Sequence, residues 1–173
     1  SGVSETTKTG SLVSAFIEGY YEDRQVPIVG VSCSKGGTAS SFWMPDGKPL
    51  NDAIARHNSA KDWLEENGYI IEHDYMVWLQ GESDGGQNVS SEQYASNLTA
   101  IIEEMIAKTN IEFCAIIRIG HAKTNPNRHK DIIYSQTNLC KTYDKAVLIS
   151  TMLAGCSGDQ MKDEYHYKQS TYN

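Results

Sequence analysis

The chain has 173 residues, of which 39% are hydrophobic and 21% are charged. This composition is typical of a globular protein, and the length predicts a single domain, residues 1–173, with a sizeable core. The formal net charge of -7 argues against a nucleic-acid partner, because a phosphate backbone would be repelled and the sequence has no Lys/Arg run. No apolar run approaches the roughly 20 residues of a membrane span, so we expect no membrane contact in a soluble, cytoplasmic or secreted chain.

The four cysteines lack the spacing of a metal site or a redox motif. Neither a CxxC pair nor a histidine at a metal-ligand interval accompanies them, so we expect no metal ion. Two of them fall in or beside strand-like segments, where a thiol usually behaves as a small buried hydrophobic group. We therefore predict free thiols at Cys33, Cys114, Cys140 and Cys156.

The first part of the chain is predicted to form a helix, a strand and a second helix. From Leu12, apolar residues recur at steps of three and four, the period of a helix with one buried face. The β-branched stretch VPIVGVSC, residues 26–33, predicts a short buried strand. A helical pattern then runs over 52–67 and ends at Gly68, a favourable residue after a helix C-terminus.

Three further strands alternate with two helices in the rest of the chain. Ser90 and Gln93 form a capping-box pattern before an amphipathic helix, and another helix is expected at 128–144. Strands that alternate with helices form parallel sheets covered on both faces, so the predicted fold class is α/β. The three strands are predicted at 75–80, 111–119 and 145–150.

Polar and glycine-rich segments follow the predicted strands, at the edge where α/β proteins bind ligands. The stretch VWLQGESDGG passes directly from apolar strand residues into Gln80 and the polar residues behind it. The other segments at this edge are 32–38, 120–121 and 157–166. We therefore expect the functional site at the carboxyl edge of the sheet.

Three of these segments carry groups suited to acyl transfer. The consecutive Gly36 and Gly37 leave backbone N–H groups open to a ligand, as an oxyanion hole requires. Gln80 would add a neutral side-chain donor. Asp163 lies three residues before His166, a spacing that lets a carboxylate orient an imidazole acting as general base.

Each of these signals also has a plain structural explanation. The glycine pair fits a tight turn, Gln80 a hydrogen bond within a loop, and the Asp-x-x-His pattern a solvated surface pair. Glu82 and Asp84 suggest the paired carboxylates of a glycosidase, but two residues apart on one loop they need not face each other. The agreement of several signals at one sheet edge favours the acyl-transfer interpretation.

Three blocks of the sequence are similar to those of a known family. The stretches CSKGGTASSFW, VWLQGESD and DEYHYKQSTYN resemble the Gly-Gly-Thr, Gln-Gly-Glu and closing Asp-x-x-His blocks of the sialate O-acetylesterase-like carbohydrate esterases, a branch of the SGNH hydrolase superfamily. The resemblance begins at about residue 11 and spans nearly the whole chain. It implies a flavodoxin-like three-layer α/β/α sandwich that removes acetyl groups from sugars by a Ser-His-Asp mechanism without a metal or organic cofactor.

The same resemblance implies roles for individual residues. His166 would be the general base and Asp163 its orienting carboxylate, while Gln80 and Gly37 would donate hydrogen bonds to the oxyanion. The substrate would be an acetylated carbohydrate, whether xylan, a sialic acid or a smaller sugar. The substrate side of the site and its loop would be formed by Gly36, Thr38, Glu82 and Asp84.

The family's nucleophile block, Gly-Gln-Ser-Asn at the end of an initial strand, has no counterpart in the sequence. We expect the sheet to lack this first strand, which would lie between the strands at 26–33 and 75–80, and the fold to lack its last helix. An upstream segment or another chain would then supply the strand and its serine. Weaker candidates are the serines near the predicted edge: Ser32, Ser34, Ser40, Ser41 and Ser83.

A second function fits the same resemblance. A degenerate copy without a nucleophile would be a noncatalytic glycan-binding remnant, for which ten tyrosines and three tryptophans offer stacking surfaces. A Gly-Gln-Ser-Asn block upstream in the reading frame would favour the esterase. Its absence there would favour the binding module.

Overall fold

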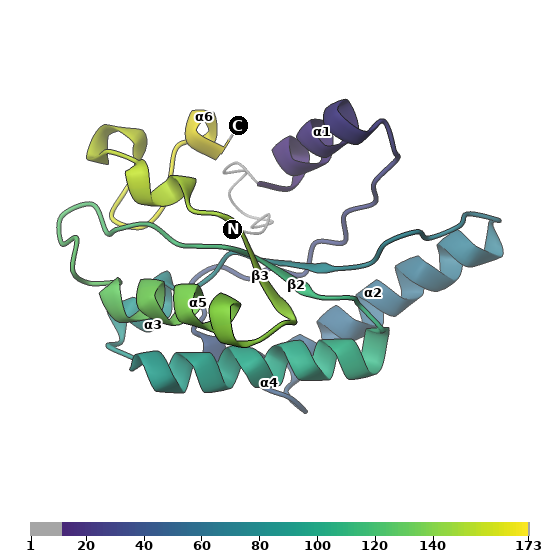
Figure 1. The fold of residues 1–173 in the computed structure, drawn as a ribbon, viewed down its shortest axis with the longest axis horizontal. Helices are drawn as coiled ribbons and strands as arrows, with labels where there is room; N and C mark the ends of the chain where they lie inside the picture. Colours follow the sequence, from purple (N-terminus) through teal and green to yellow (C-terminus); the bar gives the residue numbers. More distant parts are fainter. Residues whose placement is uncertain (1–11, 173) are drawn as a thin grey trace.

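The computed structural model describes residues 12–172 and has a small parallel sheet at its centre (Figure 1). The central strand pairs with a neighbour on each side, and a helix separates each strand from the next along the chain. This arrangement confirms the predicted α/β class. The strands lie in the order β1 (Met76–Trp78), β2 (Cys114–Ile117) and β3 (Ala146–Ser150).

Helices lie on both sides of the sheet (Figure 1). One side carries three long helices and a short one: α2 (Lys48–Glu66), α3 (Glu82–Gly86), α4 (Ser91–Thr109) and α5 (Lys130–Thr142). The other side carries a first helix and three short ones: α1 (Leu12–Arg24), η2 (Met152–Gly155), η3 (Gly158–Gln160) and α6 (Gln169–Tyr172).

The helix α4 shows how the sequence determines one of these elements. The Ser90 hydroxyl accepts a hydrogen bond from the Gln93 backbone N–H at 3.2 Å, the N-cap expected from the sequence. The helix ends at Asn110, whose φ of 60° lies in the left-handed region typical of helix ends. Its apolar residues repeat at helical spacing and are buried: Tyr94, Leu98, Ile101, Ile102 and Met105.

The core has two parts, one on each face of the sheet. The larger part joins α2, α4 and α5 to inward-facing strand residues such as Cys114 and Ile116. All four residues of β2 are buried, so this central strand is covered on both faces. The smaller part contains residues of the C-terminal segment together with the end of β2: Ile117, Leu153, Met161 and Tyr167.

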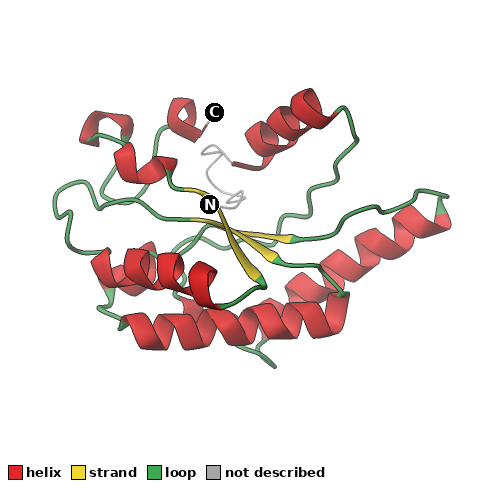
Figure 2. Cartoon of the chain, viewed as in Figure 1, coloured by secondary structure: helices red, strands yellow, loops and turns green. Residues whose placement is uncertain are grey.

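The strand predicted at 26–33 is not a strand in the structure. This segment has no regular secondary structure, and Val26, Val29 and Val31 are exposed (Figure 2). β-branched residues form a strand only where a neighbouring strand completes their backbone hydrogen bonds. Among the described residues, no strand pairs with this segment or with β1 on the side away from β2. Val29 and Val77 are therefore not on adjacent bonded strands, the arrangement that would have contradicted the expected gap.

The other predicted helices and strands are present with slightly different bounds. Two further features of the structure differ from the prediction. The polar run after β1 is predicted as a loop but forms α3, which the Gly85 N–H closes by donating to the Gly81 carbonyl at 2.9 Å. The helix α1 was predicted to have one buried face but contains no fully buried residue, although the coil that follows it passes close to Ile17. A Cβ atom at Gly30 of that coil would lie 3.0 Å from Ile17 Cδ1.

Three chain-wide features bear on the kind of protein this is. No helix in the described part of the chain is long and apolar enough to cross a membrane. Residues 12–172 contain no group of three or more His, Cys, Asp or Glu side chains placed to hold a metal ion. All four cysteines are free thiols, and burial raises the pKa of the Cys114 thiol, so it behaves as a core residue.

Candidate active site

The chain turns sharply at Gly81, between β1 and α3 at the carboxyl edge of the sheet. Gly81 has a φ of +146°, and a Cβ atom there would lie 2.7 Å from Ile132 Cγ2 of α5. A side chain at this position would strain the backbone and collide with the helix. The turn brings Asp84 of α3 next to the short helix η1 (Ser40–Trp43).

Asp84 is the centre of a buried polar network. Its side chain is fully buried, and both carboxylate oxygens accept hydrogen bonds. The Ser40 backbone N–H donates at 2.9 Å and 3.1 Å, and the Ser40 hydroxyl and the Gln80 amide each donate at 2.5 Å. Asn97 of α4 in turn donates to Ser40 Oγ at 3.0 Å. Asp84 therefore joins η1, α3 and α4 inside the protein rather than facing a ligand.

Ser40 is also too deeply buried to be a nucleophile. It lies beside a carboxylate, but none of its surface is exposed, and its hydroxyl is engaged by Asp84 and Asn97. A substrate ester could not reach this hydroxyl without opening the network. Of the serines named from the sequence, Ser40 is thus a structural residue.

The side-chain amide of Gln80 is directed into the protein. Its nitrogen donates to the Thr38 carbonyl oxygen at 3.0 Å and to Asp84 Oδ2 at 2.5 Å, which uses both amide hydrogens. Its backbone carbonyl accepts from Tyr94 Oη at 2.9 Å and from Gln136 Nε2 at 2.8 Å. Donation to an oxyanion would require one of the two amide contacts to open.

Gly36 and Gly37 form an exposed turn next to this network. A Cβ atom at either glycine would meet no atom within 4 Å, and Gly37 has a φ of +72°. The Thr38 hydroxyl closes the turn by donating to the Lys35 carbonyl at 2.9 Å, and it accepts from Trp43 Nε1 at 3.0 Å. The backbone of the glycine pair is therefore accessible to a ligand.

Residues 161–167, which we call the base turn, hold the predicted His–Asp pair. Met161 and Tyr167 form an antiparallel bridge at its neck. His166 Nδ1 lies 2.8 Å from Asp163 Oδ2 and 2.9 Å from Asp163 Oδ1, and Oδ1 also accepts from two backbone N–H groups of the turn. The contact expected from the Asp-x-x-His spacing is therefore present, while the catalytic role of the pair stays a prediction.

The hydrogen bonds of the base turn also set the charge of Asp163. Burial acts to raise the pKa of Asp163, but the backbone N–H groups of Tyr165 and His166 and the His166 imidazole outweigh it and hold that pKa below its usual range. An ionised carboxylate keeps a proton on Nδ1 and leaves Nε2 as the acceptor. The His166 ring is 53% exposed, and within residues 12–172 no partner occupies Nε2. The imidazole is therefore open to a proton donor from outside.

The two middle residues of the base turn anchor it to the segment that follows β2. Glu164 accepts from the Thr124 hydroxyl at 2.8 Å and 2.9 Å and from the Thr124 backbone N–H at 3.2 Å. The Tyr165 hydroxyl accepts from Arg128 Nη1 at 2.6 Å. At the neck, Tyr167 packs so closely on Gly120 that a Cβ atom at this glycine would collide with its hydroxyl. The base turn is thus held in place by the carboxyl end of β2.

Glu82, the first residue of α3, carries a carboxyl group near the base turn. Its side chain is partly buried, and it forms no salt bridge with any residue of the described range. Desolvation raises the pKa of Glu82, and its own backbone N–H and the charges of His129 and His166 oppose this shift only in part. Because α3 begins just after β1 ends, Glu82 lies at the carboxyl edge of the sheet.

A cavity of about 340 Å³ opens beside this edge, between α3 and the start of α5. Its lining is mostly polar and combines amide groups with charges of both signs. Arg128 belongs both to this lining and to the anchor of the base turn, so the cavity and the His–Asp pair are neighbours. The lining includes Gly85, Asn88, Asn125, Arg128, Lys130 and Asp131.

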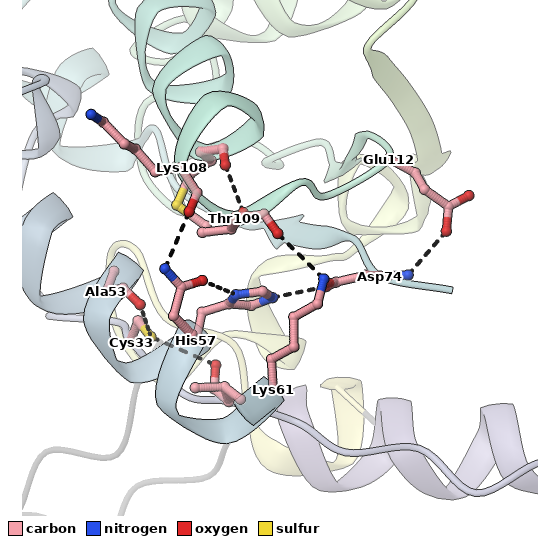
Figure 3. Close-up of polar contacts among 11 residues, drawn as sticks. Cys33, Ala53, His57, Lys61, Asp74, Lys108, Thr109 and Glu112 are labelled. Carbon is pink, nitrogen blue, oxygen red and sulfur yellow. Dashed lines mark hydrogen bonds and ion pairs between the residues drawn. The ribbon is translucent and has the colours of Figure 1, made fainter. Parts of the chain in front are cut away.

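A second His–Asp pair lies at the opposite, amino edge of the sheet (Figure 3). His57 Nε2 of α2 lies 2.8 Å from Asp74 Oδ1, just before β1. Lys61 Nζ contacts Asp74 Oδ2 at 3.1 Å, and Asn58 Oδ1 lies 3.2 Å from His57 Nδ1. Both ring nitrogens of His57 are therefore occupied within the protein.

Sequence reasoning missed three polar residues of this region. Asn97 and Gln136 are buried and lie at apolar positions of the helical stripes in α4 and α5, where they bind Ser40 and Gln80. The available signal was a polar residue at a helix position where the apolar spacing predicts a buried side chain. His129 is only 1% exposed, and no feature of the sequence distinguishes it.

The fold and the base turn define the general class: an α/β domain with a His–Asp pair at the carboxyl edge of its sheet, where such folds bind ligands. A family model described as carbohydrate esterase, sialic acid-specific acetylesterase, matches residues 3–172. The chain belongs to this family of carbohydrate esterases, which confirms the resemblance found in the sequence blocks.

Comparison with known proteins adds evidence on the fold. The chain is similar to the crystal structure of a protein from Arabidopsis thaliana, with a TM-score of 0.68 and 18% sequence identity over 93% of this chain. At this identity the similarity shows the fold alone. The chain spans 61% of the length of that protein. No curated protein sequence matches the chain.

Proposed function

We propose that the chain carries the general base of an esterase that removes acetyl groups from carbohydrates. The base turn is the observation that supports this most directly. His166 Nδ1 is fixed by Asp163 at 2.8 Å, the ring is half exposed, and Nε2 remains open toward a ligand. Membership of a carbohydrate esterase family supports the reaction class, and the geometry of the pair supports His166 as the base.

The reaction proceeds in two balanced steps. A serine hydroxyl attacks the acetyl carbonyl while His166 Nε2 takes the hydroxyl proton, and the same proton then passes to the departing sugar oxygen as the ester bond breaks. Water attacks the acetyl-serine in the same manner, which releases acetate and restores the serine. Asp163 stabilises the imidazolium formed in each step.

The Gly36–Gly37 turn supplies the oxyanion donors in this proposal. Its backbone is exposed and has no side chain to keep a carbonyl oxygen away. Gln80 joins as a second donor once its amide releases Thr38 or Asp84 on substrate binding. Gly36 and Glu82 are the remaining predicted residues with groups free to contact the sugar, since Thr38 and Asp84 are bound to the protein.

The nucleophilic serine is supplied by a strand that binds along the open edge of β1. Within residues 12–172, β1 pairs with β2 alone, and the segment 26–33 forms no strand beside it. A backbone N–H or C=O group left unsatisfied and buried costs about 1–3 kcal/mol, so a strand that pairs there is stabilising. An upstream segment or another chain provides it.

The test is acetate release from p-nitrophenyl acetate and from acetylated xylan or sialic acid. The protein to assay is the longest product of the reading frame that encodes these residues. His166→Ala should lower turnover by at least about a thousandfold, because comparable triads lose on the order of a millionfold without their histidine. His73→Ala, which changes an exposed histidine at the amino edge, is the matched control. Equal turnover in the two variants would refute the base assignment.

The alternative is a noncatalytic glycan-binding module of the same fold. Two observations favour it: the Ser40 hydroxyl is inaccessible, and both Gln80 amide hydrogens are engaged. In that case acetylated oligosaccharides should bind without releasing acetate. Isothermal titration together with an acetate assay on the same sample separates the two functions.

A further inference from the structure

The cavity of about 340 Å³ beside α3 has no role in the reaction proposed above. Three parts of the chain line it: the turn after α3, the segment after β2 and the first turn of α5. Its volume lies in the range of about 300–1,000 Å³ that is typical of small-molecule sites. The cavity is therefore large enough for a small ligand at the carboxyl edge of the sheet.

Two asparagine side chains of this lining are available to a ligand. The backbone N–H of Asn88 donates to the Gly85 carbonyl at 3.3 Å, and that of Asn127 donates to Asn125 Oδ1 at 3.2 Å. The side-chain amides of Asn88 and Asn127 have no partner among residues 12–172, and both residues are exposed. Each amide offers two donor hydrogens and one acceptor oxygen. Such groups suit hydroxyls, which also donate and accept.

The charges around the cavity balance one another. Arg128 lies 3.7 Å from the Glu164 carboxylate, so this cation is already paired. Lys130 and Asp131 are consecutive residues of opposite charge. An acidic ligand would therefore meet no surplus of positive charge in the cavity, and the net charge of -7 on the chain would repel it. The ligand that fits this lining is uncharged and rich in hydroxyl groups.

Arg128 connects the cavity to the base turn. Its side chain lines the cavity, and its Nη1 donates to Tyr165 Oη at 2.6 Å. The guanidinium carbon also lies 5.7 Å from the centroid of the Tyr165 ring. Tyr165 directly precedes His166 in the chain. A ligand in the cavity would therefore lie next to the side chain that anchors the base turn.

We propose that this cavity is a subsite for an uncharged sugar unit of the substrate, in which Asn88 and Asn127 bind the sugar hydroxyls. The carbohydrate nature of the ligand rests on the proposed function, whereas the choice of residues rests on the geometry of the cavity. Asp131 balances Lys130 and so disfavours acidic sugars. A xylose unit should therefore bind in this subsite more tightly than a sialic acid, which carries a carboxylate.

Titration of the protein with xylotriose tests the subsite without turnover. Nitrogen-15 NMR should show shifts in the side-chain amide signals of Asn88 and Asn127. The double variant Asn88→Gly, Asn127→Ala should bind xylotriose about tenfold more weakly, because it loses hydrogen bonds from two side chains. Glycine suits position 88, where φ is 55°. Asn138→Ala, at an exposed position of α5 outside the cavity, is the matched control and should bind as the unchanged protein does.

A second titration tests the preference for uncharged sugars. The probe is β-1,4-linked triglucuronic acid, which is xylotriose with a carboxylate on each ring. We expect it to bind at least about fivefold more weakly than xylotriose. Asp131→Asn, which leaves the Lys130 charge unbalanced, should reduce this difference. Equal or tighter binding of the acidic trimer to the unchanged protein would refute the preference.

Two results would overturn the subsite. One is a xylotriose titration that shifts neither amide signal, and the other is a double variant that binds xylotriose as tightly as Asn138→Ala. In an active esterase, the double variant should also lower kcat/KM for acetylated xylotriose about tenfold relative to kcat/KM for p-nitrophenyl acetate, which has no sugar. Acetate release with an unchanged ratio would refute the subsite and leave the esterase standing. Binding of xylotriose at both amides without acetate release would do the reverse.

Discussion

Two His–Asp contacts of the same length lie at opposite edges of the sheet. His57 and Asp74 meet at 2.8 Å at the amino edge, and His166 and Asp163 meet at 2.8 Å at the carboxyl edge. The His57 side chain is 16% exposed and that of His166 is 53% exposed. The contact distance alone therefore does not tell a structural pair from a candidate base.

The two pairs differ in whether the second ring nitrogen of the histidine has a partner and in which other groups bind the aspartate carboxylate. Asn58 occupies the second nitrogen of His57, and Lys61 shares Asp74, so this cluster is closed (Figure 3). The second nitrogen of His166 has no partner within residues 12–172, and Asp163 is held by local backbone N–H groups. An imidazole acts as a base when one nitrogen is fixed and the other is open, and of these two pairs the carboxyl-edge pair satisfies this condition.

The buried network beside the carboxyl edge should show the largest effect on stability. Asp84→Ala removes an acceptor shared by Ser40 and Gln80 and leaves their donors unsatisfied in a buried site. We expect a loss of about 3–5 kcal/mol in the free energy of unfolding, measured by urea denaturation. Asp62→Ala, at an exposed position of α2, should change it by less than about 0.5 kcal/mol. A similar small change at Asp84 would show that the network is not rigid in solution.

Replacing His57 and replacing His166 should have clearly different effects on the free energy of unfolding. His57→Ala breaks a partly buried cluster and should cost about 1–3 kcal/mol of unfolding free energy. His166→Ala removes a half-exposed ring and should cost less than about 0.5 kcal/mol. Thermal and urea unfolding of both variants checks this. If His166→Ala is the more destabilising change, the base turn is a structural feature rather than an open site.

Glu82 predicts an unusual dependence of stability on pH. Its pKa in the folded state is raised above the ordinary value of about 4.3, so its stabilising contribution is fully present below that pH and is lost as pH rises through the folded-state pKa. The unchanged protein should therefore lose stability relative to Glu82→Gln as pH rises. Urea unfolding of both proteins over a pH series measures the difference.

The control for this pH series has the opposite sign. Hydrogen bonds from its own backbone N–H and from Ser91 lower the pKa of Glu92, so its small contribution is lost as pH falls, not as it rises. Glu92→Gln should therefore differ from the unchanged protein mainly at acidic pH. A difference for Glu82→Gln that follows the Glu92 pattern would contradict a raised pKa of Glu82.

The smallest expected effect concerns the anchor of the base turn. Thr124→Val removes the hydroxyl that donates to Glu164 but keeps the backbone N–H contact, and Thr124→Ser keeps both. We expect a loss of about 0.5–1 kcal/mol for the valine variant and almost none for serine. Hydrogen exchange of the 161–167 amides gives the local measurement. Equal protection in the two variants would argue that the anchor does not hold the turn.

Sequence patterns predicted most of the fold because the spacing of apolar residues and the helix caps can be recognised within a single segment of chain. The helices at 91–109 and 130–142 and the strands at 114–117 and 146–150 follow from apolar spacing and caps. The strand at 26–33 failed for a non-local reason, since β-branched residues cannot pair without a neighbour. The β-propensity describes a single segment, whereas a strand forms only when two segments pair their backbones.

The candidate site was predictable only in part. The spacing of Asp163 and His166 was enough to predict their contact, because both groups lie within one turn of chain. The direction of the Gln80 amide was not, since its partners come from segments far apart in the sequence. His129 shows the limit most clearly: only the packing of the loop after β2 on α3 reveals its unoccupied nitrogen.

The turn at Gly81 affects how variation at this position should be interpreted. Any side chain there would meet Ile132 and force an unfavourable backbone, so a library selected for folding alone would return glycine at position 81. Invariance of this residue among relatives would therefore record a packing constraint. Evolutionary evidence for catalysis has to come from its neighbours, at positions where folding tolerates substitution and chemistry does not.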